Sequence, residues 1–130
     1  MLINDIHIES STACNGSCVM CPHSEMKRSG EMEFDLFKKI ADDALNIGIP
    51  RITPFRLGEP LLFRDLYIWL DYLKDKPVVV SLFTNGSLLT KEDALKLDTY
   101  SPNVIMTISF HGYDKLSYES NLLHYFKFFL

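Results

Sequence analysis

Cysteine is scarce in this chain and confined to one place. All 3 cysteines lie in the stretch CNGSCVMC, from Cys14 to Cys21. A secreted disulfide framework uses an even number of cysteines spread along the chain, so this pattern argues against one. Reduced thiols in a reducing compartment fit better, and we expect a cytoplasmic protein.

Basic charge and long apolar runs are also lacking. The 13 Lys and Arg residues are scattered and outnumbered by 17 Asp and Glu, which predicts no nucleic-acid partner. No apolar run reaches the ~18 residues of a membrane span, so none is expected. Asp5 and Glu9 stand where a signal peptide would need a basic start and an apolar run, and we expect no such peptide.

The remaining composition is that of a single globular domain. Hydrophobic residues make up 47% of the 130 positions, which allows one domain with a core. Alternation or β-branched runs predict four strands, over 5–10, 51–56, 77–83 and 104–109. Helical spacing of apolar residues predicts helices over 34–47, 62–73 and 90–97, with a further helical segment from Tyr113.

Single residues mark where these elements end or weaken. Gly48 stands where the first helix should stop, and Thr90 and Asp93 have capping-box spacing at the start of the third. Pro54 removes a donor from the second strand and leaves its register in doubt. Strands that alternate with helices form parallel βαβ units. Such units build either an open doubly wound sheet or part of a βα barrel, which periodicity alone does not separate.

Polar or metal-binding groups follow every predicted strand. The stretches are the cysteine cluster, GEP (58–60), TNG (84–86) and SFHG (109–112). Chemistry gathers at the carboxyl ends of parallel strands in both architectures. We therefore expect one edge of the sheet to carry thiols, a carboxylate, an amide and a hydroxyl.

The cysteines permit more than one kind of metal site. A closed zinc site needs four ligands, and His23 is the nearby candidate for the fourth, although it follows Cys21 closely with Pro22 between them. In a 4Fe-4S cluster, 3 cysteines leave one iron without a protein ligand, open to a substrate or cofactor. A chance grouping of structural cysteines is the third alternative.

The spacing C-x3-C-x2-C after a first strand, followed by GEP and TNG after the next two, closely resembles the radical S-adenosylmethionine (radical SAM) enzymes. CVMCPHS with a later GEM (30–32) is similar to the branch with SPASM-type C-terminal extensions, which modifies peptides, proteins or small molecules. The resemblance covers about residues 5–112 and implies an α/β fold of parallel βα units forming a partial, incomplete TIM barrel. The matched region is the N-terminal part of the family's core domain, and residues 10–24 form the loop that would hold the cluster.

The resemblance implies a role for each motif residue. Cys14, Cys18 and Cys21 would hold the 4Fe-4S cluster, whose open iron binds S-adenosylmethionine. Met20 would lie against the adenine, or simply pack the loop. Glu59 would accept a hydrogen bond from the methionine ammonium of the cofactor, or alternatively favour a helix N-terminus.

The other motif residues have local alternatives of the same kind. Gly58 would allow close backbone approach and Pro60 would stiffen the turn. Thr84 and Asn85 would border the cofactor, unless Asn85 only makes a turn. Ser109 would lie near the ribose or carboxylate of the cofactor, or cap local backbone. His111 stands where many relatives have an acidic residue, and we assign it no role.

The function implied is reductive cleavage of S-adenosylmethionine to a 5'-deoxyadenosyl radical that abstracts hydrogen from a peptide or small-molecule substrate. An external flavodoxin-like or ferredoxin-like protein would donate the electron. The alternatives are a non-catalytic iron-sulfur or zinc module and a plain electron carrier. Family domains have more βα units than the four predicted here, so we expect 1–130 to be a single shortened core. The apolar stretch 121–130 and the open sheet edge predict a partner chain or a covering segment.

Overall fold

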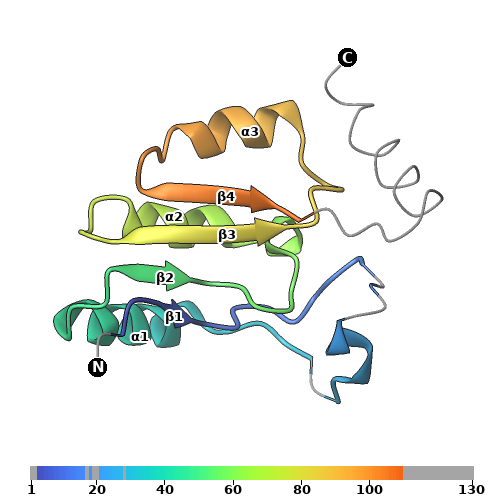
Figure 1. Cartoon of the computed structure of the whole chain (residues 1–130), viewed down its shortest axis with the longest axis horizontal. Coiled ribbons are helices and arrows are strands. Elements are labelled where there is room, and N and C mark those ends of the chain that lie inside the picture. Colours follow the sequence, from blue (N-terminus) through green and yellow to red (C-terminus); the bar gives the residue numbers. More distant parts are fainter. Residues whose placement is uncertain (1–2, 17, 19–20, 28, 110–130) are drawn as a thin grey trace.

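A computed structural model describes residues 3–16, 18, 21–27 and 29–109. Four strands alternate with three α-helices and two short 3₁₀ turns (Figure 1). The strands are β1 (Ile6–His7), β2 (Arg51–Thr53), β3 (Val79–Thr84) and β4 (Val104–Ile108). The helices are α1 (Phe34–Asn46), α2 (Leu66–Leu73) and α3 (Lys91–Asp98), and the 3₁₀ turns are η1 (Pro22–Glu25) and η2 (Pro60–Leu62).

The four strands form one parallel sheet in the order β1-β2-β3-β4. Their arrows point the same way in Figure 1, and the blue turn η1 lies beyond the arrowheads of the sheet. A doubly wound sheet reverses its strand order at a switch point, and this one does not. The order is that of consecutive βα units of a barrel, in agreement with the predicted incomplete TIM barrel.

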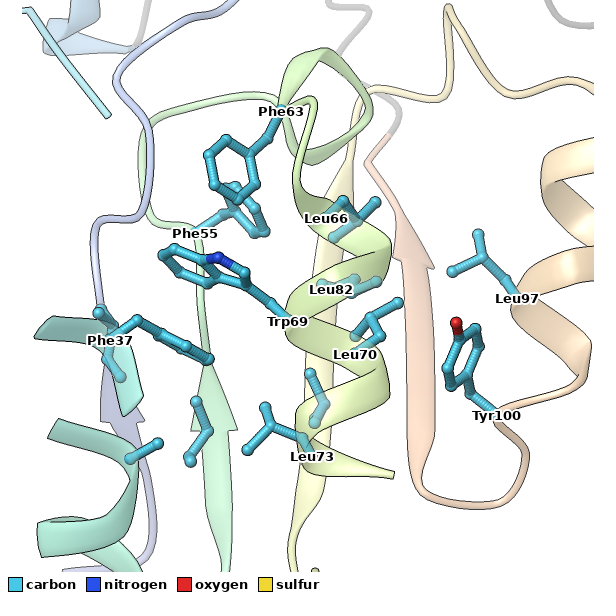
Figure 2. Packing of buried hydrophobic residues seen from close by; sticks show 14 of the residues in the cluster. Phe37, Phe55, Phe63, Leu66, Trp69, Leu70, Leu73, Leu82, Leu97 and Tyr100 are labelled. Atoms are coloured by element: carbon cyan, nitrogen blue, oxygen red, sulfur yellow. The ribbon is translucent and has the colours of Figure 1, made fainter. Parts of the chain in front are cut away.

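The helices cover one face of this sheet. The ring of Phe37 in α1 stacks on Trp69 in α2 with centroids 3.7 Å apart (Figure 2). Tyr67 in α2 stacks on Tyr100 after α3 with centroids 6.5 Å apart. Strands β2 and β3 contribute Ile52, Val80 and Leu82 to the same cluster, and Ile8, directly after β1, joins them. Side chains of alternate strand residues, such as Phe83 and Ile105, are exposed on the opposite face. That face is the inner face of the partial barrel.

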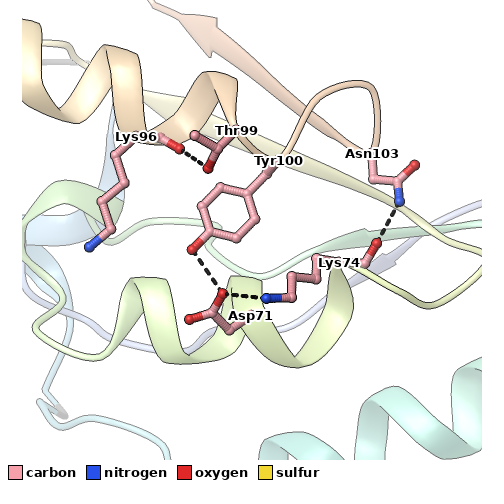
Figure 3. A network of polar contacts seen from close by, with 6 residues as sticks. All are labelled: Asp71, Lys74, Lys96, Thr99, Tyr100 and Asn103. Atoms are coloured by element: carbon pink, nitrogen blue, oxygen red, sulfur yellow. Dashed lines mark hydrogen bonds and ion pairs between the residues drawn. The ribbon is translucent and has the colours of Figure 1, made fainter.

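A polar network joins α2 to the turn between α3 and β4 (Figure 3). The hydroxyl of Tyr100 and the ammonium of Lys74 both donate to Asp71, each at 3.2 Å. The side-chain amide of Asn103 donates to the carbonyl of Lys74 at 2.7 Å. These contacts hold the end of α2 against the turn between α3 and β4. They therefore fix the position of the β3–α3–β4 unit relative to α2.

The predicted helix ends are confirmed at two positions. Gly48 has a positive φ of 81° and donates to the carbonyl of Leu45, while Ile49 donates to Ala44, which is the Schellman arrangement. Thr90 accepts from the backbone N–H of Asp93, and Asp93 accepts from the N–H of Thr90, which completes the capping box.

The first two strands are shorter than predicted, but their pairing continues past the strand ends. Ile6 pairs with Ile52, and beyond that pair Ile8 donates to the carbonyl of Thr53 at 2.8 Å. Ser10 donates to the carbonyl of Pro54 at 3.2 Å. Pro54 therefore lies past the last residue of β2 and acts as an acceptor, so its missing N–H does not disturb the register.

Two further expectations differ from the structure or lie outside it. Leu62 belongs to η2 instead of the following helix, which starts at Leu66 because Glu59 and Pro60 set up a separate 3₁₀ turn first. The helical segment expected from Tyr113 lies outside the described residues. Within the described residues, none of the helices is long and apolar enough to cross a membrane.

Candidate functional site at the carboxyl ends of the strands

The cysteine loop is closed at its base by a short antiparallel stem. Ser11 bridges to Glu31, and Met32 donates to the carbonyl of Ser10 at 2.8 Å. Thr12 donates to the carbonyl of Gly30 at 3.0 Å. The GEM stretch at 30–32 thus pairs with the segment that leaves β1. This pairing fixes where the loop begins and ends relative to the sheet.

The three cysteines are free thiols at this end of the sheet. Cys14 and Cys21 are partly buried and Cys18 is exposed. Burial raises the pKa of the Cys14 thiol above its ordinary value. The backbone N–H of Gly16 opposes this rise in pKa, while the charges of Glu59, Cys18 and Cys21 add to it.

Gly16 provides a space between the sulfur atoms. A Cβ built at Gly16 would lie 3.6 Å from Sγ of Cys14, 3.7 Å from Sγ of Cys18 and 3.7 Å from Nδ2 of Asn85. The backbone N–H of Gly16 also donates to Sγ of Cys14 at 3.3 Å. The thiols of Cys14 and Cys18 and the amide of Asn85 therefore lie around Gly16, which has no side chain. Thiol sulfur is a suitable ligand for iron or another thiophilic metal.

The zinc alternative depends on His23 as a fourth ligand. Among the residues that the structure describes, no three His, Cys, Asp or Glu side chains converge on a single ion position. Nε2 of His23 lies 2.6 Å from the carbonyl oxygen of Thr12 and anchors η1 to the loop stem. A cluster makes a different demand, because it distributes its cysteine ligands over separate irons. The three thiols are donors of the kind that an iron-sulfur cluster uses.

Glu59 is the polar centre of the site. Its side chain is only 3% exposed. Oε1 accepts from the hydroxyl of Thr84 at 2.5 Å and from the N–H of Leu61 at 3.1 Å, and Oε2 accepts from the N–H of Asn85 at 2.8 Å. The backbone N–H of Glu59 donates to the carbonyl of Ala13 at 2.7 Å. Glu59 therefore joins the ends of β2 and β3 to the cysteine loop, and it caps η2 as the local alternative predicts.

Gly58 and Pro60 on either side of Glu59 have clear structural reasons. A Cβ on Gly58 would lie 2.1 Å from the carbonyl oxygen of Ser11, so only glycine allows this close approach. Pro60 is buried at the start of η2, where its missing N–H costs nothing. Both residues keep the GEP loop packed against the root of the cysteine loop.

Asn85 both forms a turn and contacts the cysteine loop. Its Oδ1 accepts from the N–H of Ser87 at 2.9 Å, which is an Asx turn preceding α3. Its Nδ2 donates to Oδ1 of Asn15 at 2.9 Å, and Nδ2 of Asn15 donates to the hydroxyl of Ser87 at 2.8 Å. This amide network ties the residue after Cys14 to the end of β3.

Ser109, Met20 and His111 are the remaining residues that the sequence singled out. The backbone N–H of Ser109 donates to the carbonyl of Thr84 at 2.8 Å, which extends the β3–β4 ladder and brings Ser109 next to Thr84. Met20 and His111 lie outside the described residues. The described members that the structure brings together are Cys14, Cys18, Cys21, Gly58, Glu59, Pro60, Thr84, Asn85 and Ser109.

Two residues of this region were not predicted from the sequence. Asn15 was visible only as part of the cysteine stretch, and its contacts with Asn85 and Ser87 lie far along the chain. Glu9 continues the alternation of Asp5, before β1, and His7, within β1, and its carboxylate contacts the loop before Glu59. Its partners lie far along the chain, so no local pattern reveals them.

The fold and site define an α/β protein with consecutive parallel βα units and a cysteine-bearing loop after the first strand. The family model described as the Radical SAM superfamily matches residues 8–126. The chain therefore belongs to the radical SAM superfamily.

Individual relatives agree with this membership. The S-adenosyl-L-methionine-dependent 2-deoxy-scyllo-inosamine dehydrogenase of Niallia circulans is 31% identical over 99 residues, covering 70% of this chain and 38% of that protein. The crystal structure of BtrN in complex with AdoMet and 2-DOIA superposes with a TM-score of 0.76 at 23% identity, covering 92% of this chain and 55% of that one. The crystal structure of Streptococcus suis SuiB bound to precursor peptide SuiA superposes with a TM-score of 0.71 at 20% identity, covering 89% of this chain and 26% of that one.

The two structural likenesses establish the fold. The chain spans well under two thirds of the length of each of these three proteins.

Proposed function

We propose that this chain binds a 4Fe-4S cluster through Cys14, Cys18 and Cys21 and binds S-adenosylmethionine beside Glu59. When bound, the cluster and cofactor supply reductive cleavage to a 5'-deoxyadenosyl radical, which abstracts hydrogen from a substrate. The protein residues hold and orient the two groups. Membership of the superfamily supports the proposal, as does the convergence of the described motif residues at one edge of the sheet.

The observation that carries the proposal is the hydrogen bonding of the Glu59 carboxylate. A carboxylate accepts about four hydrogen bonds. The described residues supply three of them, two to Oε1 and one to Oε2. One acceptor position on Oε2 remains within the described part of the chain, on a rigidly held and buried group. An ammonium of the cofactor is a suitable donor for it, because charge-assisted hydrogen bonds are the strong ones.

The other motif residues would act around this contact. Gly58 and Pro60 would keep the Glu59 loop against the cysteine loop, and Thr84 would orient the Glu59 carboxylate. Asn85 would fix the loop near Cys14 through Asn15 and border the cofactor. Ser109 would face the ribose or carboxylate of the cofactor from the end of β4, and Met20 would lie against the adenine.

The substrate class is a peptide or a small molecule. The relatives support both, since SuiB was crystallised with a precursor peptide and BtrN with 2-DOIA. We further propose an external flavodoxin-like or ferredoxin-like electron donor and a reducing cytoplasmic location, because a cluster with one open iron is sensitive to oxygen. Residues 1–130 are proposed to act as one domain. A partner chain is proposed to cover the sheet edge at β4, which pairs with no further strand among the described residues.

Anaerobic reconstitution tests the proposal. The chain should bind about four irons with matching sulfide, and its electron paramagnetic resonance spectrum should change when S-adenosylmethionine is added. With dithionite it should release methionine and 5'-deoxyadenosine. A complete cluster whose spectrum ignores S-adenosylmethionine would refute the cofactor site. Bound zinc without sulfide would instead favour a non-catalytic structural module. A spectral response without any cleavage would restrict this chain to cofactor binding.

A further inference from the structure

Glu9 lies in the segment between β1 and the cysteine loop, and its carboxylate accepts hydrogen bonds from three consecutive backbone N–H groups. Oε1 lies 3.3 Å from the N of Arg56, 3.3 Å from the N of Leu57 and 3.2 Å from the N of Gly58, and Oε2 lies 3.0 Å from the N of Leu57. The chain bends around one anion at residues 56–58. Successive N–H groups that converge in this way form an anion-binding nest.

The next N–H in the sequence is also bound by the segment that follows Glu9. Glu59 donates its backbone N–H to the carbonyl of Ala13. Residues 56–59 are thus held, one N–H after another, by the stretch that leads from β1 to Cys14. Glu9 supplies the charged part of this attachment, and hydrogen bonds to a charged acceptor are about twice as strong as neutral ones.

Gly58 depends on the hydrogen bond to Glu9 for its position. It passes so close to Ser11 that a side chain would collide with the carbonyl oxygen. A glycine has no side chain to pack, so its position must be set by its backbone contacts. The N–H of Gly58 donates to Glu9, and this bond fixes the residue immediately before Glu59.

We propose that Glu9 is a positioning residue for S-adenosylmethionine binding, which acts by holding the 56–58 backbone so that the Glu59 carboxylate faces the cofactor. The inference rests on the proposed function. Glu9 is assigned no contact with the cofactor, because its carboxylate already makes four contacts with the 56–58 backbone, three at Oε1 and one at Oε2. Glu9 therefore affects cofactor binding indirectly, through the position of Glu59.

Glu9→Gln tests the proposal in the 130-residue chain, with Glu92→Gln on the exposed face of α3 as the matched control. The amide replaces one oxygen by an NH₂ group that repels the nest, so amide hydrogen exchange at 56–58 should accelerate in the metal-free chain. Loss of a charge-assisted bond predicts about tenfold weaker S-adenosylmethionine binding by the reconstituted protein. Iron and sulfide content should equal that of the parent chain. Glu92→Gln should change none of these quantities.

A double variant separates positioning from general stabilisation. If Glu9 acts through Glu59, then Glu9→Gln combined with Glu59→Gln should bind S-adenosylmethionine no more weakly than Glu59→Gln alone. Additive losses would overturn the proposal, as would unchanged exchange at 56–58 in Glu9→Gln. Should the parent chain show no response to S-adenosylmethionine, the proposed function fails. The exchange measurement on the metal-free chain would still decide whether Glu9 holds the loop.

Discussion

The hydroxyl of Thr84, the last residue of β3, donates a 2.5 Å hydrogen bond to Oε1 of Glu59 in the loop after β2. Both side chains are buried, at 1% and 3% exposure. The same hydroxyl oxygen accepts from the N–H of Gly86 at 2.9 Å, so it serves the turn after β3 as well. This hydroxyl therefore links the loop after β2 to the turn after β3, beside the bond from the Asn85 N–H to the same carboxylate.

Replacing Thr84 by valine should weaken both the fold and cofactor binding. The change keeps the shape but leaves Glu59 with one donor fewer and the Gly86 N–H without this acceptor. We expect the free energy of unfolding to fall by about 1–3 kcal/mol in urea denaturation. Thr84→Ser restores the hydroxyl and should stay close to the parent chain. Equal stability of the valine and serine variants would contradict this contact.

Gly58→Ala should separate the GEP loop from the cysteine loop. The new Cβ would lie 2.1 Å from a backbone oxygen of Ser11, which has no flexible end that can yield. Overpacking of this kind costs about 1–3 kcal/mol or more, and urea denaturation of the metal-free chain measures it.

Gly16→Ala is the matched control for this steric effect. Its Cβ would meet its nearest neighbours at 3.6 and 3.7 Å, which are ordinary contact distances. We therefore expect a smaller loss of unfolding free energy for Gly16→Ala than for Gly58→Ala. The reverse order would show that Gly58 is not packed against Ser11.

Periodicity and end signals in the sequence were sufficient to predict the kind and order of the main strands and helices. The β-branched run before Thr84 became the longest strand, and Gly48 and the Thr90–Asp93 pair ended and started helices as predicted. The strand-end rule then placed the cysteines, Glu59 and Asn85 at one edge, since parallel strands all present their carboxyl ends there. Local patterns therefore predicted which residues would meet.

The sequence could not predict how these residues contact one another. The carboxylate of Glu9 binds N–H groups that lie 47 to 49 positions away, and backbone donors carry no residue signature. Similarly, Asn15 meets Asn85 across 70 positions through amides that are common in turns. The choice between a barrel and a doubly wound sheet also depended on strand order, which long-range packing decides.

Asp42 in α1 provides a pH-dependent contribution to stability. Its carboxylate accepts from the hydroxyl of Tyr72 at 2.6 and 2.7 Å and from Lys76 at 3.1 Å, and these bonds lower the pKa of Asp42. A carboxyl whose pKa is lower in the folded state stabilises the fold above its unfolded pKa, near 4. That contribution disappears as the pH falls through the folded-state pKa.

Asp42→Asn should therefore destabilise the chain at pH 7, and its difference from the parent should shrink as the pH falls below about 4. Urea denaturation of both chains across this range measures the difference. Asp75→Asn, at an exposed position after α2, makes the same charge change without the Tyr72 contact. A pH-independent gap for Asp42→Asn would mean that its loss of stability has another origin.

Asn15→Ala should loosen the cysteine loop while leaving the rest of the fold intact. The variant loses the bonds from Asn85 and to Ser87, both at an exposed position, so the free energy of unfolding should change by only about 1 kcal/mol. The loop that carries Cys14 would then be attached to β3 by fewer contacts. Iron should consequently be removed faster from the reconstituted variant by a chelator under anaerobic conditions.

Two control variants make this outcome specific. Asn46→Ala changes the exposed last residue of α1 and should release iron at the parent rate. Ser87→Ala removes only one of the two bonds of Asn15, so its rate should lie between those of the parent and Asn15→Ala. If Asn15→Ala and Asn46→Ala release iron equally slowly, the amide network does not hold the loop, and the stem formed by residues 10–12 and 30–32 must be sufficient to fix it.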